Sequence, residues 1–179
     1  HLAHRLGRTD RFAAPWPSHL RLRRAALAAL ADDDRVDTDF VIRDRYRAGV
    51  RSLAERADRT HPTASAFFDN IRANAYTLCV RGGGNFSTRL YETLCLGRIP
   101  VIVATGLVLP RIGGDAWDEL AVVVPADGLE DLADRLVAHH AGLDGEAFLD
   151  AQRRCRALWL DRLSVDGFFD HLPELLTTR

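Results

Sequence analysis

Three consecutive glycines stand in the middle of the chain, between a segment typical of a buried strand and a segment typical of a helix. The apolar residues 76–80 (YTLCV) come first, residues 81–85 (RGGGN) follow, and residues 86–96 carry the helical pattern. Glycines let a backbone approach a ligand closely. The unpaired N–H groups and the positive dipole end of a helix N-terminus favour phosphate. The unit therefore predicts a phosphate-binding loop.

Two arginines and one acid add charge to this loop. Arg81 ends the strand and Arg89 lies in the first turns of the helix. Arginine binds phosphate oxygens through two parallel hydrogen bonds. Glu92 follows Arg89 by three residues, so both side chains lie on nearly the same helix face. A carboxylate beside a phosphate site is typical of a group that accepts hydrogen bonds from ribose hydroxyls. The combination indicates a nucleoside diphosphate site.

Related motifs do not fit the spacing. Residues 82–87 read G-x-G-x-x-S, which lacks the third glycine of the dinucleotide fingerprint, and no acid follows the strand predicted at 99–103. NAD binding is therefore not expected, and the G-x-S-x-G elbow of a hydrolase is absent. A structural alternative stays open, in which the glycines only make a tight turn and Arg89 and Glu92 form a surface ion pair.

The composition describes one folded domain without a strong charge excess. The chain has 179 residues, of which 47% are hydrophobic and 27% are charged. A formal net charge of −1 argues against nucleic acid as a partner, and no apolar run is long enough for a membrane span. All 24 basic residues are arginine, which excludes a P-loop or Schiff-base lysine. The chain begins at His1 and has no methionine, so we expect a segment of a longer protein.

The elements that position the loop alternate between strands and helices. Strands such as 121–124 (AVVV) are apolar on both faces, which favours a parallel sheet covered by helices on both sides, a Rossmann-like α/β fold. Ligands of such sheets bind at the carboxyl ends of the strands. We expect strands at 38–43, 76–80, 99–103 and 121–124, and helices at 19–31, 64–74, 86–96, 129–140, 146–160 and 164–176.

Four arginines outside the glycine loop could have a structural role instead of binding a ligand. Arg21, Arg23 and Arg24 form a basic cluster on the first helix, which we interpret as a solvated face. Arg43 follows the strand predicted at 38–43, at the productive edge of the sheet. A contact to a base or sugar and a structural ion pair with Asp44 both stay open for it. No spacing of histidines, cysteines and acids predicts a metal site.

The central segment resembles the exostosin family of glycosyltransferases, specifically the C-terminal half that binds the nucleotide sugar. The resemblance is specific over residues 66–125 and loose elsewhere. It rests on Arg81-Gly82, on Ser87-Thr88-Arg89-Leu90-Tyr91-Glu92-Thr93-Leu94, on Gly97 and Ile99-Pro100-Val101, and on Thr105-Gly106, Leu109-Pro110 and Trp117.

The resemblance implies one half of a GT-B fold, in which two Rossmann-like domains face each other across a cleft. Residues 1–179 would be a single donor-binding domain, with the helix at 164–176 available to pack on an absent N-terminal acceptor domain. The implied reaction transfers a sugar from a nucleotide diphosphate, expected to be a UDP-sugar, to a glycan hydroxyl. The family implies inversion at the sugar carbon, no metal and no cofactor other than the donor.

The predicted site follows from the motif and the resemblance together. Arg81 and Arg89 are expected to stabilise the departing diphosphate, and the general base is expected to come from the absent domain. The residues expected to bind the donor are Gly82, Gly83, Gly84, Asn85, Phe86, Ser87, Thr88, Glu92, Arg43 and Thr105. A non-catalytic nucleotide- or phosphate-binding module is the alternative function.

The compartment follows only from composition and resemblance. The Arg- and Ala-rich, Lys-free sequence suits a GC-rich genome and favours a bacterial cytoplasm. The Golgi lumen is the alternative if the protein is eukaryotic.

Overall fold

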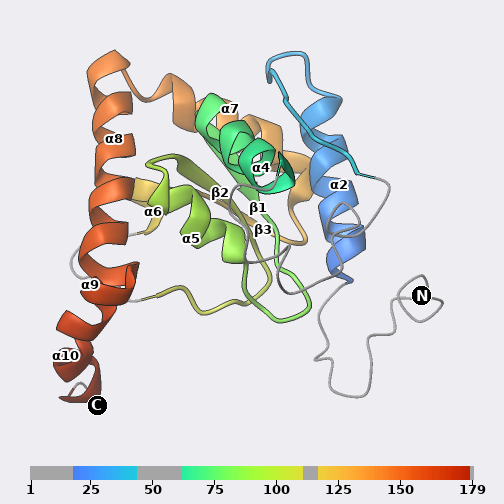
Figure 1. Cartoon of the computed structure of the whole chain (residues 1–179). Coiled ribbons are helices and arrows are strands. Elements are labelled where there is room, and N and C mark those ends of the chain that lie inside the picture. Colours follow the sequence, from blue (N-terminus) through green and yellow to red (C-terminus); the bar gives the residue numbers. More distant parts are fainter. Residues whose placement is uncertain (1–17, 44–61, 111–116, 178–179) are drawn as a thin grey trace.

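A parallel sheet of three strands lies at the centre of the structure, a computed structural model that describes residues 18–43, 62–110 and 117–177. The strands are β1 (Tyr76–Cys79), β2 (Ile99–Ala104) and β3 (Val122–Pro125), in the order β1-β2-β3 (Figure 1). Leu78 aligns with Val101, and Val103 aligns with Val124. The predicted Rossmann-like α/β class and three of the four predicted strands are confirmed.

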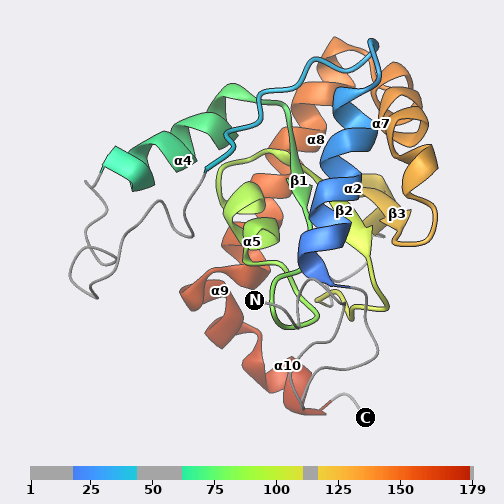
Figure 2. The ribbon, with the colours of Figure 1, turned by 90° about the vertical axis from the view of Figure 1, so that its right-hand side faces the viewer.

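Helices cover both faces of this sheet, as its apolar strands predict. The helix α2 (His19–Ala31) and the consecutive η2 (Leu129–Asp131) and α7 (Leu132–Ala141) pack on one face. The helices α5 (Thr88–Cys95), α6 (Trp117–Leu120) and α8 (Gly145–Leu158) pack on the other. Figure 2 shows α2 in front of the strands and α8 behind them. Within β2, Val101 and Val103 face α2 and α7, while Ile102 faces α5 and α8.

The helix α5 ends where glycine is required. Gly97 has a φ of +62°, its N–H donates to the Leu94 carbonyl at 3.0 Å, and the Arg98 N–H donates to the Thr93 carbonyl at 3.0 Å. This pair of bonds is a left-handed helix end. At its other end α5 begins at Thr88 rather than at the predicted Phe86.

The strand predicted at 38–43 is wrong. These residues have no regular secondary structure, because their polar groups bind the helix α4 (Pro62–Ala73) instead of the sheet. Asn70 donates to the backbone oxygen of Asp39 at 3.0 Å and to its carboxylate at 2.8 Å. The apolar residues that suggested a strand, Val41 and Ile42, are 56% and 74% exposed.

The C-terminal region is divided more finely than its sequence pattern predicts. The helix α8 continues into a π-helical turn, η3 (Trp159–Leu163), and α9 (Val165–Asp170) is followed by α10 (Leu172–Thr177). The predicted helix 164–176 is therefore interrupted at His171. No helix in the described ranges is long and apolar enough to cross a membrane.

The junction of η3 and α9 has no room for a side chain at Gly167. A Cβ there would lie 2.5 Å from the carbonyl oxygen of Leu160 and still closer to that of Asp161. Gly167→Ala should therefore destabilise the fold by about 1–3 kcal/mol, the usual cost of overpacking. Urea unfolding measures the loss, and Gly145→Ala is the matched control because a Cβ there meets nothing within 4 Å. Equal stability of the two variants would contradict the tight junction.

Candidate functional site

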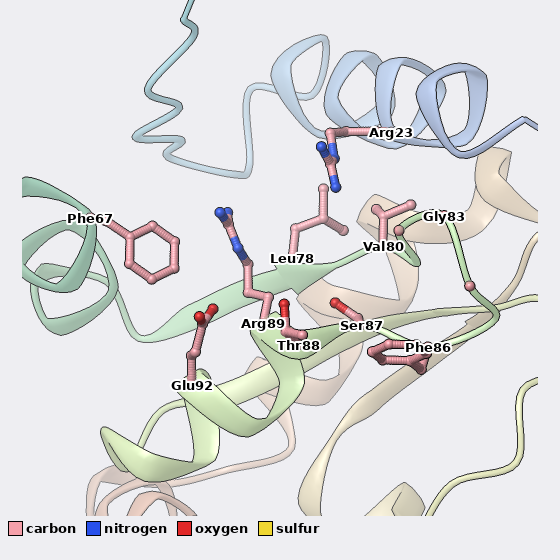
Figure 3. Close-up of a pocket in the computed structure, with 12 residues that line it drawn as sticks. Arg23, Phe67, Leu78, Val80, Gly83, Phe86, Ser87, Thr88, Arg89 and Glu92 are labelled. Carbon is pink, nitrogen blue, oxygen red and sulfur yellow. The ribbon is translucent and has the colours of Figure 1, made fainter. Parts of the chain in front are cut away.

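A pocket of about 450 Å³ lies at the carboxyl end of β1, within the size range of small-molecule sites. Side chains from α2, α4 and α5 surround it, and β1 forms its floor (Figure 3). Its lining consists of Arg23, Phe67, Leu78, Val80, Gly82, Gly83, Gly84, Phe86, Ser87, Thr88, Arg89 and Glu92. The location agrees with the expected productive edge of a parallel sheet.

Arg81 is not on the pocket wall. Leu78 and Val80 line the pocket, whereas Cys79 packs in the core on the other face of the sheet, and Arg81 is not part of the lining. Arg81 is only 2% exposed, and its Nη1 donates to the Gly82 carbonyl at 3.1 Å. Burial lowers the pKa of its guanidinium. Arg81 therefore contacts the backbone of the glycine loop from outside the pocket lining, and its phosphate contact stays a prediction.

The glycine loop presents bare backbone to the pocket. The Gly82 N–H donates to the Phe86 carbonyl at 3.0 Å and closes the loop. Gly82 and Gly83 lack the positive φ that would require glycine, and an added Cβ at either position meets nothing within 4 Å. Neither backbone strain nor packing in the described part of the chain explains these two glycines. Glycine at both positions leaves the backbone open to close approach from the pocket.

The other predicted donor-binding residues fall into two groups. Phe86, which is 57% exposed, lines the pocket together with Ser87 and Thr88 at the α5 N-terminus. Asn85 instead bonds with Thr105 at the end of β2: its amide donates to the Thr105 carbonyl at 3.2 Å, and the Thr105 hydroxyl donates to its Oδ1. These two residues tie the loop to the sheet and do not line the pocket.

Arg43 also lies away from the pocket wall. Its Nη2 donates to the Thr63 carbonyl at 3.5 Å, near the start of α4. The expected alternative, an ion pair with Asp44, involves a residue outside the described ranges. The structure thus brings Arg43 to α4 rather than to the lining of the pocket.

Arg23 is the main residue that the sequence interpretation missed. All three arginines of the basic cluster on α2 are exposed, but Arg23 also projects into the pocket opposite Arg89 (Figure 3). The helical period of about 100° per residue could have indicated the position of Arg23 on α2. Leu22, Ala26 and Leu30 form the buried stripe of α2, and Arg23 flanks that stripe while Arg21 and Arg24 face away from it.

The positive charges of the two pocket arginines are not balanced by ion pairs with acidic side chains in the described part of the chain. Among the described residues neither Arg23 nor Arg89 forms an ion pair. Partial burial, and after it the positive charge of Arg89, lowers the pKa of Arg23. Two guanidinium groups that face one space and repel each other favour a bound anion. The α5 N-terminus adds backbone N–H groups without helical partners beside them.

Glu92 is the acidic group of the pocket. It is half-buried, and burial raises the pKa of its carboxyl, while the charge of Arg89 partly opposes that rise. Phe67 of α4, a second residue that the sequence interpretation missed, faces Arg89 across the pocket. No group of three or more potential metal ligands is found in the described ranges.

Comparisons with known proteins agree with this geometry. A probable glucuronosyltransferase of Oryza sativa subsp. japonica is 35% identical to the chain over 72 residues, and the probable β-1,4-xylosyltransferase IRX10 of Arabidopsis thaliana is 33% identical over the same length. Each match covers 40% of this chain but only 17% of the relative. The sequence model of the Exostosin GT47 domain matches residues 18–138, which hold the sheet and every residue that lines the pocket. The chain therefore belongs to the exostosin family, as part of its GT47 glycosyltransferase domain.

Proposed function

We propose that this domain binds the diphosphate of a nucleotide sugar, a UDP-sugar, in the pocket between α2 and α5. One observation carries the proposal: Arg23 and Arg89 share a pocket in which the described residues offer them no ion pair. Family membership supports a glycosyltransferase over the non-catalytic binding module. The phosphates would lie against Gly82 and Gly83, where no Cβ blocks their approach.

The reaction would join the donor sugar to a glycan hydroxyl. The acceptor oxygen forms a bond to the anomeric carbon, and the bond from that carbon to the diphosphate oxygen breaks. The acceptor proton passes to a general base, which we place in the acceptor-binding part of the protein. The nucleoside diphosphate leaves with the electron pair. Its growing charge would be met by Arg23, Arg89 and the α5 N–H groups, which are fixed before the reaction and could act without a metal.

Glu92 and Arg81 would have supporting roles. The Glu92 carboxylate lines the pocket three residues beyond Arg89 and would accept hydrogen bonds from the ribose hydroxyls. Arg81 would orient the loop through its bond to the Gly82 carbonyl. Asn85 and Thr105 would hold the loop against β2 in the same way.

Removal of either pocket arginine should weaken UDP binding. A hydrogen bond to a charged group contributes about 1.5–3 kcal/mol, so Arg89→Ala and Arg23→Ala should each reduce affinity roughly ten- to hundredfold in calorimetric titrations. Arg135→Ala is the matched control, since Arg135 is exposed on α7 and does not line the pocket. UDP binding that is unaffected by both pocket variants would refute the proposed site.

A methyl group on the glycine loop should block the ligand without harming the fold. At Gly83 an added Cβ meets nothing within 4 Å, so Gly83→Ala should leave the urea midpoint unchanged. It should weaken UDP binding by about tenfold, or about 1.4 kcal/mol. Gly145→Ala again serves as control. Wild-type affinity in the Gly83→Ala variant would mean that the ligand does not approach this backbone.

Ligand affinity should depend on the ionisation of Glu92. Its carboxyl has a pKa above the usual value because of burial, and the ionised form accepts stronger hydrogen bonds from the ribose hydroxyls than the protonated form does. UDP affinity should therefore fall as the pH is lowered through this raised pKa. The UDP phosphates also titrate, and they do so equally with every variant. The pH profile of UDP affinity is therefore compared between the wild type and Glu92→Gln, and the variant should lack the decrease that protonation of Glu92 causes. Superimposable profiles for the two proteins would contradict the role of Glu92.

A further inference from the structure

Arg89 lies against an aromatic ring from a different helix. Its guanidinium carbon is 4.8 Å from the centre of the Phe67 ring, which α4 contributes to the pocket. This distance is within the range at which a guanidinium is attracted to the negative face of an aromatic ring. Figure 3 shows the ring beside the Arg89 side chain, on the same side as Glu92.

We propose that Phe67 is a positioning residue, whose ring holds the Arg89 guanidinium over the phosphate pocket and apart from Glu92. The inference rests on the proposed function, because it concerns the readiness of that same pocket for a diphosphate. It adds a residue whose side chain would act through Arg89 rather than through contact with the reacting atoms.

The competing partner of Arg89 is close by. Glu92 is three residues further along α5, a spacing at which an arginine and a carboxylate commonly pair. The structure nevertheless has no contact of 4.0 Å or less between their charged atoms. The charge of Arg89 still lowers the pKa of Glu92 against the larger effect of burial. The two groups are thus near enough to interact but are held apart.

The ring is part of a fixed surface. Ile71 of α4 is 2% exposed, and the amides of Asn70 and Asn74 donate to the Asp39 carboxylate at 2.8 and 3.1 Å. Arg98, just before β2, donates to the Arg72 carbonyl at 2.6 Å. The α4 helix is therefore attached to the main body of the fold close to the ring.

A neighbouring ring supports Phe67 directly. The Phe68 ring meets it edge-on at 5.2 Å with an interplanar angle of 72°, a favourable geometry for two aromatic rings. Without the Phe67 ring, Arg89 would be free to pair with Glu92. The pocket would then lose a cation for phosphate and a carboxylate for ribose in one step.

Inorganic pyrophosphate is the probe for this proposal, because it has no ribose and reports on the phosphate pocket alone. Phe67→Leu should weaken its binding about threefold to thirtyfold, the range expected for a lost cation–π contact of about 0.5–2 kcal/mol. Phe67→Tyr keeps the ring and should bind like the wild type. Phe169→Leu is the matched control, because Phe169 is 62% exposed on α9 and does not line the pocket, and it should change the affinity less than twofold.

Three further measurements separate positioning from a general loss of structure. Replacement of Phe67 by trifluorophenylalanine keeps the packing but weakens the negative ring face, and it should also reduce affinity. In the Arg89→Ala background, Phe67→Leu should cause no additional loss. In the Glu92→Gln background, the loss caused by Phe67→Leu should be smaller, because the competing carboxylate is gone.

The outcomes separate the two proposals. A wild-type protein that binds neither pyrophosphate nor UDP would overturn the proposed function. Pyrophosphate binding that Arg89→Ala weakens but that Phe67→Leu and the fluorinated ring leave unchanged would overturn only the positioning role. An equal loss from Phe67→Leu with and without Arg89 would also overturn it, since Phe67 would then act independently of Arg89.

Discussion

Two like charges are held in one pocket at the end of β1. Arg23 and Arg89 come from helices on opposite faces of the sheet, and the charge of Arg89 contributes to the lowered pKa of Arg23. This arrangement costs electrostatic free energy in the empty pocket, and a bound anion would convert the repulsion into attraction. Groups that already face the place of the developing charge are the condition for strong electrostatic stabilisation of a leaving group.

The packing of the domain makes the convergence possible. On one face of the sheet, Leu22, Ala26 and Leu30 fix α2 and thus the origin of the Arg23 side chain. On the other, Leu90 and Leu94 fix α5 and the origin of Arg89. Leu78 of β1 and Val80, which follows the strand, line the same pocket as the two arginines. The core is therefore responsible for holding two groups together that would otherwise separate.

The sequence was sufficient to predict the part of the site that is local. The glycine loop, Arg89 and Glu92 lie within one short stretch, so strand–loop–helix reasoning places them together. Alternation shows which residues share a face of β1 but not which face carries the pocket, so it could not show whether Arg81 joins the pocket lining. Phe67 depends on the tertiary position of α4, which no local pattern reveals. The position of Arg23 could have been predicted from the sequence, since the buried stripe of α2 passes beside it.

A crystal structure of the chain with bound UDP tests the central claim most directly. The account predicts diphosphate oxygens within hydrogen-bond distance of both the Arg23 and the Arg89 guanidinium groups, against the backbone of Gly82 and Gly83. A diphosphate bound elsewhere, or one held by Arg89 while Arg23 remains turned away from it, would contradict the account.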